Sequence, residues 1–191
     1  PESQGTQAGL DRCAIMQKFS ALRQPATSNF SAPHARLPLY CRPMTKPIST
    51  VYLVGAGCGA PDLLTLRAAR AIAQATVLLV DDLVNEAILS EHASPTATIV
   101  HVGKRGGQAS TPQADIERLL LQHALAGERV VRLKGGEPLI FGRAGEEIAA
   151  LQAAGIPFEL VNGISAAQAA AADLGLSLTH RQHARGGNGA P

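Results

Sequence analysis

The chain has 191 residues, 46% of them hydrophobic and 17% charged, and its formal net charge is +2. This length fits one large domain or one and a half small ones, and low charge with ordinary hydrophobicity excludes a wholly disordered protein. Apolar runs stay shorter than the roughly 18–20 residues that cross a bilayer, which excludes an integral membrane protein. The three cysteines follow neither a disulfide framework nor a metal-site spacing, and the nearly balanced charge gives no sign of nucleic-acid binding.

The beginning of the chain differs from the rest in charge and patterning. Residues 1–43 contain five Lys or Arg and two Asp or Glu, whereas residues 44–191 contain twelve and thirteen. Because neither helical nor strand periodicity is visible before residue 50, we predict a disordered leader over residues 1–49. Its basic excess is compatible with an organellar transit peptide; alternatively, Met44 is the natural start and the leader is translated upstream sequence. Residues 182–191 are predicted to form a tail without packing capacity.

Apolar runs and helical patterns alternate regularly between these ends. Short apolar runs, several of them β-branched, predict five strands, at residues 51–54, 76–80, 98–102, 129–133 and 157–161. Segments with helical periodicity or composition predict helices, at residues 63–75, 84–90, 111–126, 144–154 and from 165 onward. The alternation predicts an α/β domain over residues 50–181, with a mostly parallel sheet flanked by helices.

Capping residues and strand ends locate the helix starts and the functional loops. Thr111 is expected to cap the helix at residues 111–126 with Pro112 in its first turn, and Ser165 with Gln168 is expected to form a capping box at the last helix. Ligands of parallel α/β sheets bind beyond the carboxyl ends of the strands. The informative loops are therefore those that follow the strands, at residues 55–61, 81–85, 103–111, 134–143 and 162–166.

The loop after the first strand permits two interpretations. Gly55-x-Gly57-x-x-Ala60 matches the dinucleotide fingerprint G-x-G-x-x-G/A, and Asp81 or Asp82 at the end of the next strand would hold a ribose hydroxyl. This combination favours an NAD-dependent oxidoreductase. The alternative is a plain glycine turn, because the pattern is short and the following Pro61 suits a turn better than a tight Rossmann crossing.

Longer motifs in the other loops are more specific than a glycine fingerprint. They are VGAGCGAPDLLTLR at 54–67, VDDLV at 80–84, VGKRG at 102–106, VVRLKGGEPLIFGRAGEE at 130–147, AGIPF at 154–158, NGISA at 162–166 and LTHR at 178–181. Together they resemble the tetrapyrrole methylase family, over about residues 50–184 and without a large gap.

This resemblance implies an enzyme that transfers methyl groups from S-adenosyl-L-methionine to pyrrole carbons. The chain is most similar to members that methylate uroporphyrinogen III at C2 and C7, giving precorrin-2 for sirohaem and cobalamin biosynthesis. It implies a cytoplasmic protein that works as a homodimer when full length. Because the methyl group arrives activated, the protein is expected to align donor and carbon and to handle a proton.

Two residues match the family's acid and base. By motif match, Asp81 resembles the proton acceptor and Lys104 the proton donor. From the residues alone, Asp81 would be a solvated carboxylate at a strand end. Lys104 with Arg105 would likewise be an ordinary exposed basic pair.

Other residues match the family's contacts with the methyl donor. The turn Gly135-Gly136-Glu137 resembles a Gly-Gly-Asp turn whose backbone approaches the cofactor, which requires residues without a Cβ. The remaining expected cofactor-binding residues are Cys58, Ile140, Ser165 and Ala166. Core packing for Ile140 and a plain N-cap for Ser165 are the structural alternatives, and both are compatible with cofactor contact.

The resemblance also implies a substrate site and exposes departures from the family pattern. Arg143, Glu146 and Arg181 match positions that line the substrate trough, where guanidinium groups suit a substrate with eight carboxylates. Ordinary helix-start and loop charges are the alternative. Departures stand at Ala60 and Glu137, where the family frequently has Asp, and at Asp82, where it frequently has Arg.

The resemblance ends near Arg181, although the family continues for roughly one further domain that forms the other wall of the cofactor cleft. We therefore expect residues 50–181 to correspond to an N-terminal domain with the start of a linker. On this interpretation the chain alone binds S-adenosyl-L-methionine weakly or not at all. A non-catalytic fragment is then the alternative to an active enzyme.

Overall fold

The computed structural model describes residues 47–103 and 111–181. The predicted tail, nearly all of the predicted leader, and Lys104 therefore lie outside the described residues. Within the described ranges, no helix is long and apolar enough to cross a membrane. In the same ranges, no group of three His, Cys, Asp or Glu side chains is placed to hold a metal ion.

Five parallel strands form one sheet in the order β3-β2-β4-β1-β5. The strands are β1 (Val51–Gly55), β2 (Val77–Val80), β3 (Thr98–His101), β4 (Val130–Lys134) and β5 (Phe158–Val161). This arrangement confirms the predicted α/β class. Because β4 lies between β2 and β1, the loops that follow these three strands leave the sheet side by side at its carboxyl edge.

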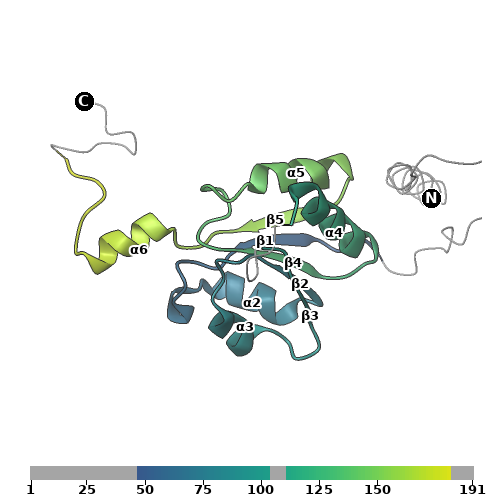
Figure 1. The fold of residues 1–191 in the computed structure, drawn as a ribbon, viewed down its shortest axis with the longest axis horizontal. Helices are drawn as coiled ribbons and strands as arrows, with labels where there is room; N and C mark the ends of the chain where they lie inside the picture. The colour runs from purple at the N-terminus through teal and green to yellow at the C-terminus, as the bar shows by residue number, and fades with distance from the viewer. Residues whose placement is uncertain (1–46, 104–110, 182–191) are drawn as a thin grey trace, which may run out of the picture. The chain divides into compact units, whose positions relative to one another are not determined.

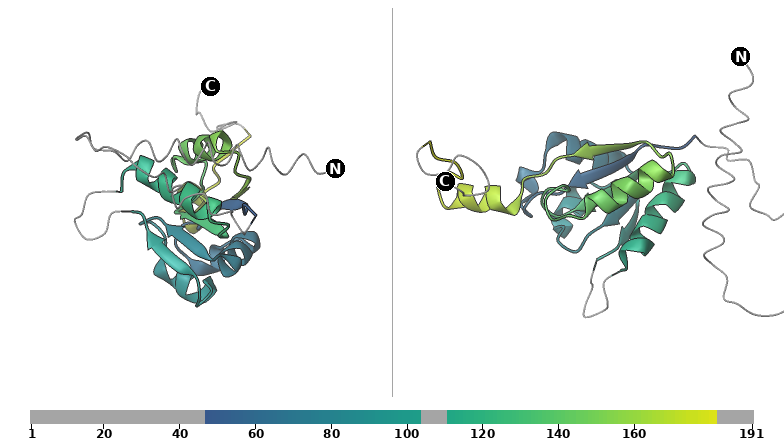
Figure 2. Two further views of the ribbon diagram at one scale, coloured as in Figure 1. Left: turned by 90° about the vertical axis from the view of Figure 1, so that its right-hand side faces the viewer. Right: turned by 90° about the horizontal axis from the view of Figure 1, so that it is seen from above.

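Helices cover both faces of the sheet (Figure 1). They are η1 (Pro61–Leu63), α2 (Leu66–Gln74), α3 (Glu86–His92), α4 (Gln113–Leu125), α5 (Ala144–Ala153) and α6 (Ala166–Asp173). Helices α2 and α3 lie on one face and α4 and α5 on the other, as two further views also show (Figure 2).

The core is divided between the two faces of the sheet because neighbouring strand residues point to opposite sides. Leu78 of β2 packs in the same buried cluster as Ile72 of α2, whereas Leu79 packs with Leu120 of α4. All four side chains are fully buried. This two-sided burial explains why the strands are short, nearly continuous apolar runs rather than alternating ones.

Helix starts follow the predicted capping residues with one exception. The capping box of Ser165 and Gln168 begins α6 as predicted. The predicted Thr111 cap is wrong, because α4 begins at Gln113 with Pro112 as its N-cap residue. Pro112 has a ψ of 142°, which lies outside the helical region and delays the helix past the proline.

Candidate active site

The loops after β1, β4 and β5 meet backbone to backbone at the carboxyl edge of the sheet. Gly57 N donates to Gly136 O (3.2 Å) and Gly136 N donates to Gly57 O (2.8 Å). A Cβ on Gly55 would lie 2.5 Å from Gly136 O and 2.6 Å from Gly163 N, which leaves no room for a side chain. Glycine at position 55 is therefore required for the three loops to approach one another.

The turn after β4 combines close packing with an open side. Gly135 packs against the loop after β2, since a Cβ there would lie 2.6 Å from Leu83 Cβ. Gly136 has a φ of 67°, which favours glycine, and a Cβ built on it would meet no atom within 4 Å. The space beside the backbone at Gly136 is therefore open, and the predicted contact of this turn with the cofactor stays a prediction.

Glu137 connects the turn after β4 to the loop after β5. Its buried carboxylate accepts hydrogen bonds from Gly163 N (2.9 Å), Asn162 Nδ2 (3.4 Å) and Leu139 N (3.4 Å). Two of these three donors belong to the loop after β5. The side chain of Glu137, which belongs to the turn predicted to approach the cofactor through its backbone, thus holds the turn after β4 to the loop after β5.

Removing this carboxylate should loosen the loop after β5. In the Glu137→Ala variant, we expect amide hydrogen exchange at Gly163 to accelerate about tenfold to a hundredfold. This range corresponds to losing a hydrogen bond to a charged group, about 1.5–3 kcal/mol. Glu137→Gln keeps an acceptor oxygen and should accelerate exchange less, which makes it the matched control. Unchanged exchange at Gly163 in the alanine variant would contradict this role.

Asp81 lies at the end of β2 beside the turn after β4. Its side chain is 34% exposed, and its Oδ2 lies 3.4 Å from Arg132 Nη2. Its Oδ1 accepts a hydrogen bond from Asp82 N (3.3 Å), and its own backbone N donates to Leu133 O (3.0 Å). The carboxylate of the predicted proton acceptor is therefore partly exposed to solvent and is contacted on its buried side by Arg132.

Asp82, the departure that reverses a charge, lies beside the end of the described segment at Gly103. A Cβ on Gly103 would clash with the Asp82 carboxylate. The side chain of Asp82 therefore borders the residue that precedes Lys104. The position of Lys104 itself lies outside the described residues.

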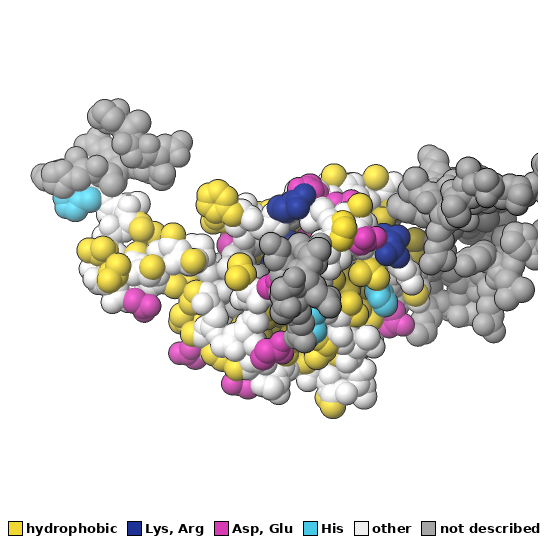
Figure 3. All heavy atoms as spheres, in the orientation of Figure 1, with side chains coloured by type: hydrophobic (Ala, Val, Ile, Leu, Met, Phe, Trp, Pro, Cys, Tyr) yellow, Lys and Arg dark blue, Asp and Glu magenta, His cyan; other side chains and the backbone are white. Residues whose placement is uncertain are grey.

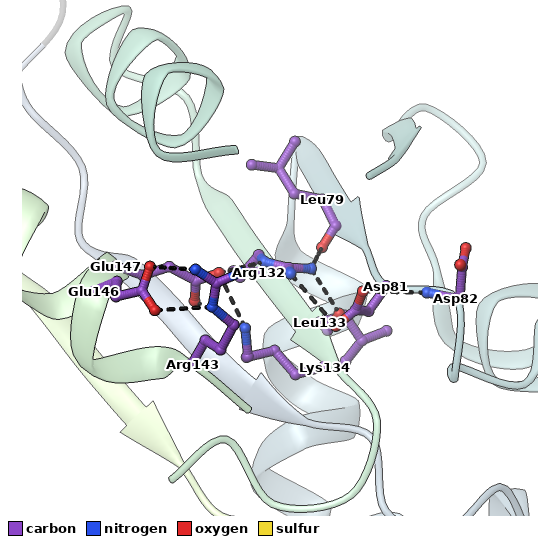
Figure 4. Close-up of polar contacts among 9 residues, drawn as sticks. All are labelled: Leu79, Asp81, Asp82, Arg132, Leu133, Lys134, Arg143, Glu146 and Glu147. Carbon is purple, nitrogen blue, oxygen red and sulfur yellow. Dashed lines mark hydrogen bonds and ion pairs between the residues drawn. The ribbon is translucent and has the colours of Figure 1, made fainter. Parts of the chain in front are cut away.

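A buried charge cluster lies beneath the site and joins β4 to α5 (Figure 4). Arg132 Nε donates to Glu147 Oε1 (2.9 Å), and Lys134 Nζ donates to both carboxylate oxygens of Glu147 (3.0 and 3.1 Å). Glu147 is fully buried, and both cations are 2% exposed. Burial lowers the pKa of Lys134, the charge of Arg132 lowers it further, and Glu147 opposes both effects. These three residues form the β4–α5 cluster.

Two of the predicted substrate residues form a pair at the start of α5. Arg143 Nε and Nη2 donate to the two carboxylate oxygens of Glu146, at 2.8 and 2.7 Å. Both side chains are exposed. These hydrogen bonds raise the pKa of Arg143 and lower that of Glu146. The pair thus presents a guanidinium group of fixed orientation near the carboxyl edge.

The remaining predicted site residues differ in their surroundings. Cys58 is an exposed free thiol, Ile140 is 52% exposed and not in the core, and Ser165 is a buried N-cap followed by an exposed Ala166. Arg181 is exposed beyond the end of α6. The segment between Ala166 and Arg181 carries the exposed apolar side chains of Leu174, Leu176 and Leu178. Figure 3 shows apolar side chains on this part of the surface.

The predicted functional residues did not include Arg132, Lys134 and Glu147. Arg132 nevertheless contacts Asp81, and Glu147 lies on the helix whose N-cap residue is Arg143. The available signal was the pair of cations at alternate positions of an otherwise apolar strand, VVRLK. Such a strand at the centre of a parallel sheet buries its cations, which then require an acidic partner.

The strand order and the loops define a parallel α/β domain with several of the predicted site residues gathered at the carboxyl edge of its sheet. The model of the family Tetrapyrrole (Corrin/Porphyrin) Methylases matches residues 50–186. The chain therefore belongs to the tetrapyrrole methylase family. This membership leaves the oxidoreductase interpretation of Gly55-x-Gly57-x-x-Ala60 without support.

Individual relatives agree with this assignment. The chain is 59% identical over 136 residues to the uroporphyrinogen-III C-methyltransferase of Pseudomonas aeruginosa, covering 71% of this chain and 55% of the relative. It is 54% identical over 140 residues to the siroheme synthase of Azotobacter vinelandii, covering 73% and 30%. A structure of uroporphyrin-III C-methyl transferase from Thermus thermophilus, complexed with S-adenyl homocysteine, has a TM-score of 0.60 and 48% identity, covering 72% of this chain and 53% of that one. The chain thus spans about half the length, or less, of these relatives.

Proposed function

We propose that this chain carries the site of an S-adenosyl-L-methionine-dependent uroporphyrinogen-III C-methyltransferase. The reaction would methylate C2 and C7 and give precorrin-2, for sirohaem and cobalamin biosynthesis. The observation that carries the proposal is the contact of the open glycine turn at Gly135 and Gly136 with the loop that bears Asp81. The names of the relatives, and the S-adenyl homocysteine bound by one of them, support it. The homodimer implied by the family resemblance is part of the proposal.

The residues at the turn after β4 fit a methyl donor of this kind. S-adenosyl-L-methionine supplies a methyl group activated by a sulfonium. The open space beside Gly136 allows close approach to the backbone. The proposed donor-binding residues are Cys58, Gly135, Gly136, Ile140, Ser165 and Ala166. Glu137 contributes by holding the turn against the loop after β5.

Asp81 supplies the base in this proposal. Forming the new carbon–carbon bond breaks the bond between sulfur and methyl carbon, and the tetrapyrrole must then lose a proton. The half-exposed carboxylate of Asp81 can accept it from a substrate lying over the sheet edge. Lys104 is proposed as the proton donor.

Arg143 supplies substrate binding in this proposal. Because its guanidinium is exposed and oriented by Glu146, it can pair with a substrate carboxylate. We expect Arg143→Ala to raise the uroporphyrinogen III concentration at half-maximal rate about tenfold, the loss of one charged hydrogen bond. Arg118→Ala on α4 is the matched control, since Arg118 forms the same kind of exposed i,i+3 pair with Asp115. An equal effect of both variants would contradict a specific role for Arg143.

The test of the proposed function is a single-turnover methyl transfer. The 191-residue chain, in excess over anaerobic uroporphyrinogen III, is mixed with millimolar methyl-labelled S-adenosyl-L-methionine, so that weak donor binding does not hide turnover. The expected result is label in the tetrapyrrole, reaching two methyl groups per molecule. Absence of label in the tetrapyrrole would contradict the proposal and favour a non-catalytic fragment.

A further inference from the structure

The guanidinium of Arg132 bridges α5 and the end of β2. Its Nε donates to Glu147 Oε1 at 2.9 Å, and its Nη2 lies 3.4 Å from Asp81 Oδ2. Its Nη1 donates to the backbone carbonyls of Leu79 and Leu133, both at 3.3 Å. Each nitrogen of the group therefore has a partner, and Figure 4 shows the side chain lying between Glu147 and Asp81.

Burial makes this bridge a fixed one. Arg132 is 2% exposed and Glu147 is fully buried. The planar fork is also anchored to the backbone of two adjacent strands through Leu79 and Leu133. A guanidinium held in this way has one orientation, so the contact that it offers to Asp81 is also fixed.

The Asp81 carboxylate is held on both of its oxygens. Arg132 contacts Oδ2 from the core, and the backbone N–H of Asp82 donates to Oδ1. A carboxylate offers about four lone-pair positions. The two contacts therefore fix the orientation of the group while acceptor capacity remains for a substrate proton.

A contribution to folding stability is a weak explanation for a buried ion cluster. Removing charges from water costs several kcal/mol per ion, and hydrophobic replacements of similar volume are frequently neutral or stabilising. The β4–α5 cluster nevertheless occupies the centre of the sheet, where apolar residues would pack. Its position directly behind Asp81 supplies a functional reason for its presence.

We propose that Arg132 is a positioning residue that orients the Asp81 carboxylate toward the substrate, and that Glu147 fixes Arg132 for this purpose. The proposal rests on the acceptor role proposed above for Asp81. Glu147 also lies in the first turn of α5 together with Glu146, and Arg143 is the N-cap residue of this helix, so the same contacts connect Asp81 to the proposed substrate residues. One buried network thus sets the positions of the acceptor and of the proposed substrate residues.

A double-mutant cycle tests the positioning role. Single-turnover rates are measured over a series of methyl-donor concentrations up to saturation for the wild-type chain, Arg132→Lys, Asp81→Asn and the double variant. Lysine keeps the positive charge but cannot contact Glu147, the two carbonyls and Asp81 together. We expect Arg132→Lys to slow transfer about tenfold, with the half-saturating donor concentration unchanged. The double variant should be no slower than Asp81→Asn, because Arg132 acts through Asp81.

Controls separate positioning from general loosening of the fold. Ile88→Val removes a methylene from the core beside the same loop, and any loss of rate that it causes should multiply with that of Asp81→Asn. Glu147→Asp retracts the carboxylate from Arg132 and is a second variant should Arg132→Lys not fold. It should show the same lack of further effect in the Asp81→Asn background.

The outcomes distinguish this proposal from the proposed function. If the losses of Arg132→Lys and Asp81→Asn multiply, Arg132 has only a structural role and the positioning proposal is overturned. If Asp81→Asn transfers methyl groups as fast as the wild type, the acceptor role itself is overturned and the positioning role falls with it.

Discussion

Replacing Asp81 with asparagine should slow methyl transfer to uroporphyrinogen III by at least about 100-fold, the lower end of what a positioned base contributes. Asparagine has nearly the same shape and its Oδ1 can still accept the hydrogen bond from Asp82 N. The fold is therefore expected to persist while the basic oxygen is lost. The single-turnover rate at saturating donor and substrate is the measurement, with circular dichroism as a check of folding.

The neighbouring carboxylate provides the control for this prediction. Asp82→Asn removes one negative charge from the same strand end without touching the contact between Asp81 and Arg132. Its rate should stay within about threefold of the wild type, since exposed surface substitutions have small effects. A large loss of rate in Asp82→Asn together with a normal rate in Asp81→Asn would contradict the prediction and indicate Asp82 as the proton acceptor.

Replacing Glu147 with glutamine should lower the free energy of unfolding by about 3–5 kcal/mol, the usual cost of removing one partner from a buried ion pair. The substitution leaves Arg132 and Lys134, which lie 15 and 13 residues before Glu147, buried without their common anion. A domain is stable by only about 5–15 kcal/mol, so this loss is a large share of the total. Urea unfolding followed by circular dichroism measures the change.

The adjacent residue is the matched control for this effect. Glu146→Gln makes the same chemical change one position earlier, at an exposed pair with Arg143. Its effect on the free energy of unfolding should stay below about 0.5 kcal/mol. Similar losses in the two variants would mean that the β4–α5 cluster is less important to the fold than its burial implies.

The loss in Glu147→Gln should shrink as pH rises. Burial already lowers the pKa of Lys134, and removing Glu147 withdraws the charge that opposes this shift. A lysine whose pKa is lower in the folded state binds fewer protons there, so stability rises with pH between the folded and unfolded values. Unfolding midpoints measured from pH 7 toward about pH 10 should therefore converge on those of the wild type. If the difference in unfolding midpoint between Glu147→Gln and the wild type widens over this range, the explanation through the lowered pKa of Lys134 is wrong.

Much of the fold could be predicted because strands at the centre of a parallel sheet are apolar on both sides. Leu78 and Leu79 face opposite helical layers, so both sides of this strand are buried. The strand therefore appears in the sequence as an uninterrupted apolar run, which is easy to recognise. The boundary at Pro112 could not be predicted, because a proline at the N-cap and one in the first turn give nearly the same sequence pattern. The φ and ψ that separate them depend on how the preceding loop approaches the helix.

The site could be predicted only in part, since glycine turns and strand ends are visible in sequence and burial of charge is not. Gly135 and Gly136 stand in a distinctive motif, and the structure places them beside the loop of Asp81 as the strand order requires. Glu146 and Glu147 are adjacent and chemically identical, yet one is exposed and the other fully buried. About 100° of helical rotation separates them, and only the packing of α5 decides which one faces Arg132.

Binding of the methyl donor at the turn after β4 can be tested residue by residue. The 15N-labelled chain is titrated with S-adenosylhomocysteine and followed by amide NMR, with NAD in a parallel titration. If the donor binds at this turn, the largest shifts are expected at Gly135, Gly136, Ser165 and Ala166, and none of comparable size with NAD. Shifts that are absent at millimolar ligand, or confined to Glu128 and Arg129 at the opposite end of β4, would contradict it.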